Sequence, residues 1–168
     1  MAADGTAIRF RTSQTFEQTT LELEREVSLN GRTVRSATWL RNRGKRPLPF
    51  RWFPHPFYPH PETDELCRFN LPVSFPANDG YEVAESGFVR RRGWPWTAGH
   101  YQALDFPGDA PLVVLQRHPK LGLVSGTCSY IPTYLPIWGN PCTFSWEPFL
   151  EGWVGAGQER AWHIDYDF

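Results

Sequence analysis

Proline and glycine interrupt this chain so often that short strands joined by turns are the architecture it favours. Its 168 residues include 16 Pro and 14 Gly, and aromatic residues, which are frequent in strands, make up 15%. The sequence contains no internal repeat, low-complexity tract or convincing helical pattern. It therefore predicts one all-β domain over residues 1–168, built as a sandwich of antiparallel sheets, with few order signals in residues 1–14.

Several segments have the pattern of strands. Apolar and polar residues alternate from Thr15 to Leu29, and Asn30-Gly31 is a strong hairpin signal before a return strand from Thr33 to Arg41. Further strands are expected at 48–53, 81–89 and 142–146, a hairpin at 112–125, and a last strand at 161–168 with Trp162, Ile164, Tyr166 and Phe168 on one face.

A proline-rich segment, Pro54-His-Pro-Phe-Tyr-Pro-His60, follows the strand predicted at 48–53. Proline lacks an N–H and fixes its own φ, so this segment can be neither an interior helix nor a central strand. We expect an extended segment that holds His55 and His60 where the strand ends.

Glu147 lies between Trp146 and Pro148, at the end of the strand predicted from Cys142. Pro148 cannot donate to a ladder, so pairing should end or loosen just after Glu147. The carboxylate either points to water or is buried with a partner, because an unpaired buried charge is very costly. If it faces a pocket, desolvation would raise its pKa and make it a usable base. The residues alone leave both interpretations open.

Charge and cysteine content narrow the function classes. A formal net charge of -1 argues against nucleic acid or an anionic membrane as the main partner. Three cysteines without metal-type spacing indicate neither a disulfide framework nor a zinc site, and we expect them to be buried packing residues. The sequence shows no signal-peptide pattern and no long apolar run, so a soluble, cytoplasmic protein is expected.

An ordered set of motifs resembles the aldose 1-epimerase (galactose mutarotase) family. In that family an N-x-G turn leads through a proline-flanked strand to a His-Pro-aromatic segment, a late strand ends in Glu-Pro, and the chain finishes on a W-x-I-x-Y strand. The matching residues are Asn42-x-Gly44, Pro47-Leu-Pro-Phe50, His55-Pro-Phe-Tyr58, Glu147-Pro148 and Trp162-x-Ile-x-Tyr166. The resemblance covers most of residues 15–168 and corresponds to the C-terminal part of the family's domain.

The resemblance implies a β-supersandwich that interconverts the α and β anomers of an aldose, with a monosaccharide or sugar derivative as partner. In this chemistry a base takes the proton of the anomeric hydroxyl while an acid protonates the ring oxygen, which opens the ring. Carried over by motif, Glu147 is the base and His55 the acid. The resemblance implies no metal and no organic cofactor.

The sequence also departs from the family pattern, since it lacks the N-terminal region that supplies an arginine and a second histidine to the sugar pocket. Arg51 and His60 are close to His55 in sequence and are stand-in candidates. Asp105 is a candidate for the family aspartate that holds sugar hydroxyls. Trp94 and Trp96 form either a stacking wall or a hydrophobic plug.

Three functions compete at this point. The first is an aldose 1-epimerase-like isomerase that uses His55 and Glu147. The second is a non-catalytic carbohydrate-binding domain of the same fold. The third is a structural domain that self-associates, for example as a homodimer, because a shortened sandwich leaves strand edges and an apolar face uncovered. The binding domain would use as stacking platforms Trp94, Trp96, Trp146 and Trp153.

Overall fold

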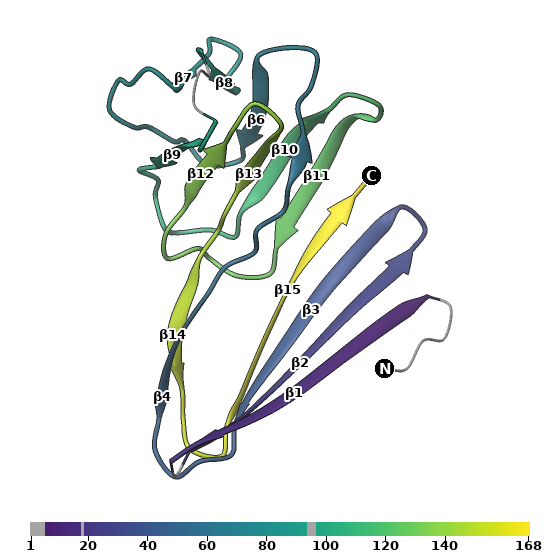
Figure 1. The fold of residues 1–168 in the computed structure, drawn as a ribbon, viewed down its shortest axis with the longest axis vertical. Coiled ribbons are helices and arrows are strands. Elements are labelled where there is room, and N and C mark those ends of the chain that lie inside the picture. The colour runs from purple at the N-terminus through teal and green to yellow at the C-terminus, as the bar shows by residue number, and fades with distance from the viewer. Residues whose placement is uncertain (1–5, 18, 94–96) are drawn as a thin grey trace.

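The computed structural model describes residues 6–17, 19–93 and 97–168, and all the regular elements in these ranges are β-strands (Figure 1). In the described ranges no helix is long and apolar enough to cross a membrane. The paired strands are antiparallel, as between β2 (Thr19–Asn30) and β3 (Thr33–Asn42). The predicted fold class, all-β with antiparallel sheets, is confirmed.

The largest sheet has nine strands and runs the length of the molecule (Figure 1). Its strand order is β1-β2-β3-β15-β11-β10-β6-β8-β7. The remaining strands are β1 (Ala7–Phe16), β15 (Glu159–Asp167), β11 (Gly122–Cys128), β10 (Val113–His118), β6 (Glu65–Phe69), β8 (Val89–Arg91) and β7 (Tyr81–Val83).

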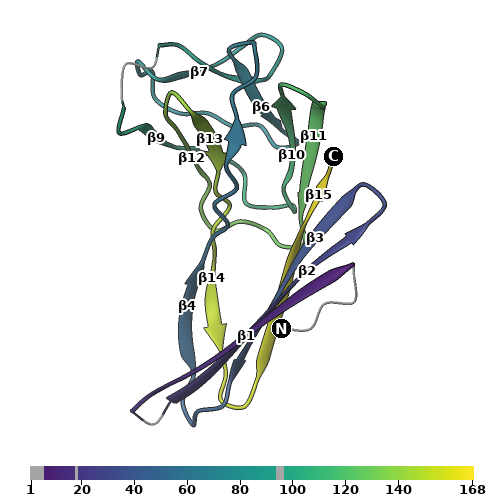
Figure 2. The ribbon, with the colours of Figure 1, turned by 45° about the vertical axis from the view of Figure 1, so that its right-hand side comes forward.

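Two smaller layers face this sheet in the two halves of the molecule (Figure 2). One is a four-stranded sheet in the order β5-β13-β12-β9, and the other is the two-stranded ribbon β14-β4. Their strands are β5 (Tyr58–Pro59), β13 (Thr143–Trp146), β12 (Pro136–Gly139), β9 (His100–Ala103), β14 (Leu150–Val154) and β4 (Leu48–Trp52).

The core lies between the four-stranded sheet and the upper half of the large sheet. Phe144, Trp146 and Ile137 point into it from β13 and β12, and each has 0% of its surface exposed. The Trp146 ring lies 5.9 Å from that of Tyr58 and 6.1 Å from that of Tyr166, measured between centroids. These contacts fix the position of β13, the strand that leads to Glu147.

The turn after β3 connects the β14–β4 ribbon to the large sheet through hydrogen bonds of Asn42. Asn42 is fully buried, and its Nδ2 donates to the carbonyl oxygens of Arg46, at 2.7 Å, and Val154, at 3.0 Å. Its Oδ1 accepts a hydrogen bond from the Gly44 N–H at 2.8 Å. Satisfying a buried amide in this way makes the turn specific, because an unpaired buried polar group is costly.

The two faces of β1, β2, β3 and β15 differ in chemistry. The outer face carries ion pairs between neighbouring strands, such as Arg35 with Asp165 at 2.7 Å and Arg43 with Glu22 at 3.0 Å. Apolar residues alternate with these charges and point to the inner face, the pattern expected for a half-buried strand. The predicted hairpin at Asn30-Gly31 is confirmed, with Gly31 at φ +60°.

Other strand predictions need correction. The single strand expected at 81–89 is wrong, because β7 and β8 form a hairpin whose turn contains Gly87 at φ +79°. Arg90 and Arg91 belong to β8 and pair with Glu82 and Asp64. Residues 7–14, where order signals are weak, form most of β1.

The expectation for the cysteines was right for two of them. Cys67 and Cys128 are buried, and burial raises the pKa of the Cys67 thiol well above its usual range. Cys142 is exposed, which corrects the expectation for that residue. It lies beside Asn140, whose Oδ1 accepts the Cys142 N–H at 2.8 Å, so the turn before β13 places its side chain outside the core.

Gly126→Ala should destabilise the fold, because a Cβ there would lie 2.5 Å from Cη2 of the fully buried Trp146 ring. Neither the strand backbone nor the packed indole can move aside easily, so we expect a loss of about 2 kcal/mol. Thermal and urea unfolding measure it. Gly108→Ala is the control, since its Cβ meets no atom within 4 Å, and equal effects of the two variants would contradict the packing argument.

Candidate active site

Glu147 follows β13, and the backbone ladder continues past it. Its N–H donates to the Pro136 carbonyl oxygen at 2.9 Å, and the Phe149 N–H donates to that of Tyr134 at 2.8 Å. Only 6% of Glu147 is exposed. The interpretation of Glu147 as a solvated residue at a strand end is therefore wrong, and the alternative, a carboxylate buried with a partner, is confirmed.

Strand alternation separates Glu147 from the neighbouring tryptophan. Trp146 faces Ile137 across the ladder and points into the core. Glu147, one residue further, points to the opposite face of the four-stranded sheet. Trp138 and Tyr101 are cross-strand partners on that face, which we call the site face.

His55 is the partner of Glu147. Its Nε2 lies 3.2 Å from Oε1 of Glu147. The imidazole comes from the proline-rich segment between β4 and β5, which has no ladder pairing until Tyr58, as the sequence predicts. The side chain of His55 is 39% exposed and that of Glu147 only 8%, so the carboxylate lies beneath an imidazole that reaches the surface.

Burial raises the pKa of Glu147 above its usual value of 4.5, while the charge of His55 acts in the opposite direction. Desolvation disfavours the ionised carboxylate, and a nearby imidazolium favours it. The net direction is upward, so Glu147 holds a proton more strongly than an exposed glutamate does. Such a carboxylate is a better base than an ordinary one once it has ionised.

Neighbouring aromatic side chains on the site face, His55 among them, form what we call the aromatic rim. Its closest ring pairs are His55 with Phe57, at 4.3 Å between centroids, and Phe53 with Phe149, at 4.5 Å, while Trp138 and Tyr101 are neighbours through the strand ladder. Its members are His55, Phe57, Trp138, Tyr101, Tyr134, Phe149 and Phe53. A small group of polar atoms within an apolar wall is typical of small-molecule sites.

The other predicted site residues have partners elsewhere. Arg51 pairs with Glu151 across β4 and β14, and its guanidinium lies 5.9 Å from the Phe149 ring, at the outside of the rim. His60 donates from Nε2 to the Asn140 carbonyl oxygen, and burial lowers its pKa. The backbone of Asp105 pairs with that of Ser74 beyond the end of β9, and its side chain is exposed. Trp94 and Trp96 lie outside the described residues.

The structure corrects the choice of stacking residues. Trp146 is fully buried in the core, so it cannot be a sugar platform. Trp153 is 64% exposed, but it belongs to the β14–β4 ribbon rather than to the site face. Sequence reasoning missed Trp138, Tyr101 and Tyr134. The alternation of Pro136, Ile137 and Trp138 was an available signal, since it opposes Trp138 to the buried Ile137.

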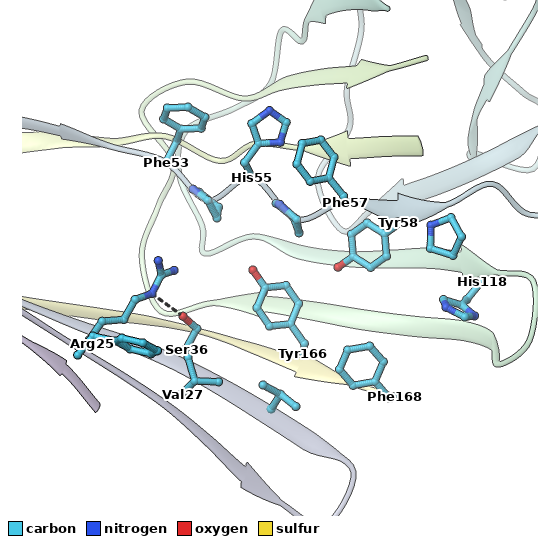
Figure 3. A pocket seen from close by; sticks show the side chains of 15 residues that line it. Arg25, Val27, Ser36, Phe53, His55, Phe57, Tyr58, His118, Tyr166 and Phe168 are labelled. Carbon is cyan, nitrogen blue, oxygen red and sulfur yellow. Dashed lines mark hydrogen bonds between the residues drawn. The ribbon is translucent and has the colours of Figure 1, made fainter. Parts of the chain in front are cut away.

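A hollow lies beside the proline-rich segment (Figure 3). Its volume is about 740 Å³, and it lies between this segment and the inner face of β2, β3 and β15. Tyr58, Tyr166 and Phe168 line it, together with Arg25, whose Nε donates to Ser36 Oγ at 3.1 Å. Glu147 is not part of its wall, whereas Phe53, His55 and Phe57 of the aromatic rim border it. The hollow and the site face therefore lie on the two sides of the proline-rich segment.

Among the residues that the structure describes, no group of three or more His, Cys, Asp or Glu side chains is arranged to hold a metal ion. The site face offers one carboxylate and one imidazole, in contact with each other. A carboxylate and an imidazole in contact are groups that can accept and donate protons.

Comparisons with known proteins give a match in structure only. No protein-family model matches the sequence, and no curated protein does. A galactose mutarotase related enzyme from Lactobacillus acidophilus matches with a TM-score of 0.74 and 12% identity, over 99% of this chain and 69% of that one. The fold is that of the galactose mutarotase-like proteins. Two further solved structures agree with this assignment.

A galactose mutarotase-like protein from Lactobacillus casei has a TM-score of 0.63 and 14% identity, with 99% of this chain and 71% of that one covered. A protein provisionally described as an aldose 1-epimerase from Klebsiella pneumoniae has a TM-score of 0.70 and 17% identity, with 98% and 51% covered. Identities this low support the galactose mutarotase-like fold alone. A substantial part of each of these proteins has no counterpart in this chain.

The raised pKa of Glu147 predicts a pH-dependent effect of Glu147→Gln on stability. Below the usual glutamate pKa both folded and unfolded states hold the proton, whereas at higher pH the folded state must ionise a buried group. Wild-type stability is thus lost as pH rises through the folded pKa, and glutamine avoids this loss. We expect the melting temperature of Glu147→Gln relative to wild type to increase from about pH 4 to about pH 7.

Glu151→Gln is the matched control, because Glu151 is a partly exposed carboxylate paired with Arg51 in the ribbon. Thermal unfolding of both variants at several pH values gives the comparison. A melting-temperature difference for Glu147→Gln that stays constant or falls with pH would contradict the burial argument.

Proposed function

We propose that this protein is an aldose 1-epimerase-like isomerase that interconverts the α and β anomers of an aldose. The observation that carries the proposal is the 3.2 Å contact between His55 Nε2 and Glu147 Oε1 on the site face. The galactose mutarotase-like fold supports it, as do the names of the structural neighbours.

The spacing of the two groups suits the reaction. The anomeric hydroxyl and the ring oxygen of an aldose are bonded to the same carbon, so the acid and the base must act on two oxygens close together. A carboxylate and an imidazole already in contact can each reach one of them with little rearrangement. Positioned acid–base groups of this kind contribute about 100-fold or more to a rate.

In the proposed first step the Glu147 carboxylate takes the proton from the anomeric hydroxyl, and the imidazolium of His55 gives its Nε2 proton to the ring oxygen. The bond between C1 and the ring oxygen breaks, and a C1=O double bond forms. Rotation about the C1–C2 bond then presents the other face of the carbonyl. In the reverse transfers, His55 takes the proton back from the attacking hydroxyl and Glu147 returns its proton to the anomeric oxygen.

The burial difference between the two groups supports these roles. Glu147 lies beneath the rim, where desolvation makes it more basic, and His55 reaches the surface, where it can contact a sugar that enters the site. The aromatic rim offers flat apolar surfaces to the C–H faces of a sugar ring. Trp138 and Phe57 lie beside His55 and take this role in the proposal.

Polarimetry on freshly dissolved α-glucose and α-galactose tests the proposal, with the spontaneous rate subtracted. Wild type should accelerate the approach to equilibrium, and Glu147→Gln and His55→Asn should each lower the catalysed rate by about 100-fold or more. His163→Asn is a control away from the site face and should keep the wild-type rate. Sugar binding without acceleration would favour the carbohydrate-binding domain over the enzyme.

Self-association is a second candidate property, favoured by the inner face of β1 and β2. Ile8, Phe10 and Leu29 are 44%, 50% and 54% exposed on this face, and pockets beside it are lined by all three of them. Exposed apolar surface of this kind is typical of interaction sites. The proposed occupant is a second copy of the chain that packs against the same face, which would form a homodimer.

Light scattering after size-exclusion chromatography tests self-association over a range of protein concentrations. We expect a dimer at high concentration that Phe10→Glu reduces, because the substitution would bury a charge in the interface. Ser13→Glu places the same charge on the outer face of β1 and should leave the dimer intact. A strictly monomeric wild type at high concentration would contradict this candidate.

A further inference from the structure

Tyr101 and Tyr134 hydrogen-bond to each other through their phenol oxygens on the site face. Tyr101 belongs to β9, and Tyr134 lies two residues before β12. Pro136, the residue whose carbonyl accepts the Glu147 N–H, pairs with Ala103 of β9. The two tyrosines therefore lie on either side of Pro136, and their hydroxyl groups meet over the cross-strand neighbour of Glu147.

The strand order places this hydroxyl pair and His55 on opposite sides of Glu147. In the sheet β5-β13-β12-β9, His55 precedes β5, Glu147 follows β13, and the tyrosines belong to the β12 and β9 side. Neighbouring strands are about 5 Å apart, so both groups lie within the reach of one sugar ring. On the site face the imidazole therefore approaches Glu147 from the β5 side, and the phenol pair lies on the β12 and β9 side.

The phenol pair has hydrogen-bonding capacity left over. Each phenol has one O–H donor, and the bond between the two phenols uses one of them. The second O–H and the remaining lone pairs are available to a ligand. Tyr101 is 51% exposed, so the pair borders the opening of the site.

Tyr101 also keeps its proton at neutral pH. Burial raises the pKa of Tyr101, and its bond with Tyr134 and the nearby charge of Glu147 act in the same direction. A phenol O–H beside a carboxylate offers a donor where the carboxylate offers only acceptors.

We propose that the Tyr101–Tyr134 hydroxyl pair binds the C2 hydroxyl of the aldose and so selects sugars that carry it. In a pyranose the anomeric carbon C1 is flanked by the ring oxygen on one side and by C2 on the other. If Glu147 acts on the anomeric hydroxyl and His55 on the ring oxygen, C2 lies on the other side of C1. The Tyr101–Tyr134 pair, which lies on the β12 and β9 side of Glu147, then meets the C2 hydroxyl. The assignment of the hydroxyl rests on the proposed function.

The selectivity follows from the environment of the pair. A sugar that covers the phenol pair separates its free O–H from solvent. If that sugar has no C2 hydroxyl to replace the solvent, the O–H is left without a hydrogen-bond partner within the apolar rim, and this costs binding free energy. A sugar without the C2 hydroxyl should therefore bind more weakly than the parent sugar. From the net strength of one hydrogen bond we expect a loss of about fivefold in affinity.

Tryptophan fluorescence measures binding, since Trp138 is part of the rim next to Tyr101. The probes are glucose and galactose, their 2-deoxy counterparts, and 3-deoxyglucose as the control for losing a different hydroxyl. Wild type should bind glucose or galactose about fivefold more tightly than the 2-deoxy sugar. Tyr101→Phe/Tyr134→Phe should bind each parent sugar and its 2-deoxy counterpart equally.

Tyr166→Phe is the matched control variant, because it removes the same hydroxyl from a residue that lines the hollow on the other side of the proline-rich segment (Figure 3). It should keep the wild-type preference. Thermal unfolding checks that each variant folds, and Tyr134→Phe alone replaces the double variant if the latter does not. Mutarotation by polarimetry is recorded in parallel on every sample.

The two readouts separate the proposals. In one outcome, wild type prefers sugars with a C2 hydroxyl, the double variant loses this preference, and no mutarotation is seen. This outcome would support the hydroxyl site and overturn the isomerase. Mutarotation with a C2 preference that the double variant keeps would overturn the hydroxyl site alone. Absence of binding to every probe, or a wild type that does not distinguish 2-deoxy sugars, would also overturn the hydroxyl site.

Discussion

A carboxylate removed from water is the constraint on which the candidate site depends. Glu147 has 6% of its surface exposed, so its charge needs a partner, and the imidazole of His55 at 3.2 Å provides one. His55 lies between β4 and β5 in a stretch that joins no sheet, and Pro54 and Pro56 on its two sides cannot donate to a strand ladder. The pair is therefore a structural solution to a buried charge, and the proposed isomerase would use it as an acid–base couple.

The position of that pair depends on how one short sheet divides its side chains. Trp146 and Ile137 enter the core, while Trp138, Tyr101 and Glu147 share the other face. Because neighbouring residues of a strand point to opposite sides, tight packing of Trp146 against Tyr58 and Tyr166 also sets the direction of Glu147. The packing of Trp146 in the core and the orientation of Glu147 are thus coupled, because the two residues are consecutive in the chain.

The long strands also divide their side chains between two faces, one charged and one apolar. On β1, β2 and β3 the outer face satisfies its charges with ion pairs between neighbours, and the inner face retains exposed apolar residues such as Phe10 and Leu29. The structural neighbours are longer than this chain, which spans between 51% and 71% of the three described above. The His55–Glu147 pair and the aromatic rim nevertheless lie within the shared part of the fold, which covers 99% of this chain in the first of these comparisons.

The sequence by itself determined the all-β class, the hairpin at Asn30-Gly31 and the extended segment that carries His55, while the choice of His55 and Glu147 as catalytic residues stays a prediction. These follow from local properties, namely proline geometry, turn chemistry, alternation and ordered motifs. Only the tertiary structure decided that Glu147 is buried, that Trp146 belongs to the core, and that Tyr101 and Tyr134 join the site face. Each of these depends on the register between strands distant in sequence, and a shift of one residue would reverse the face of every side chain.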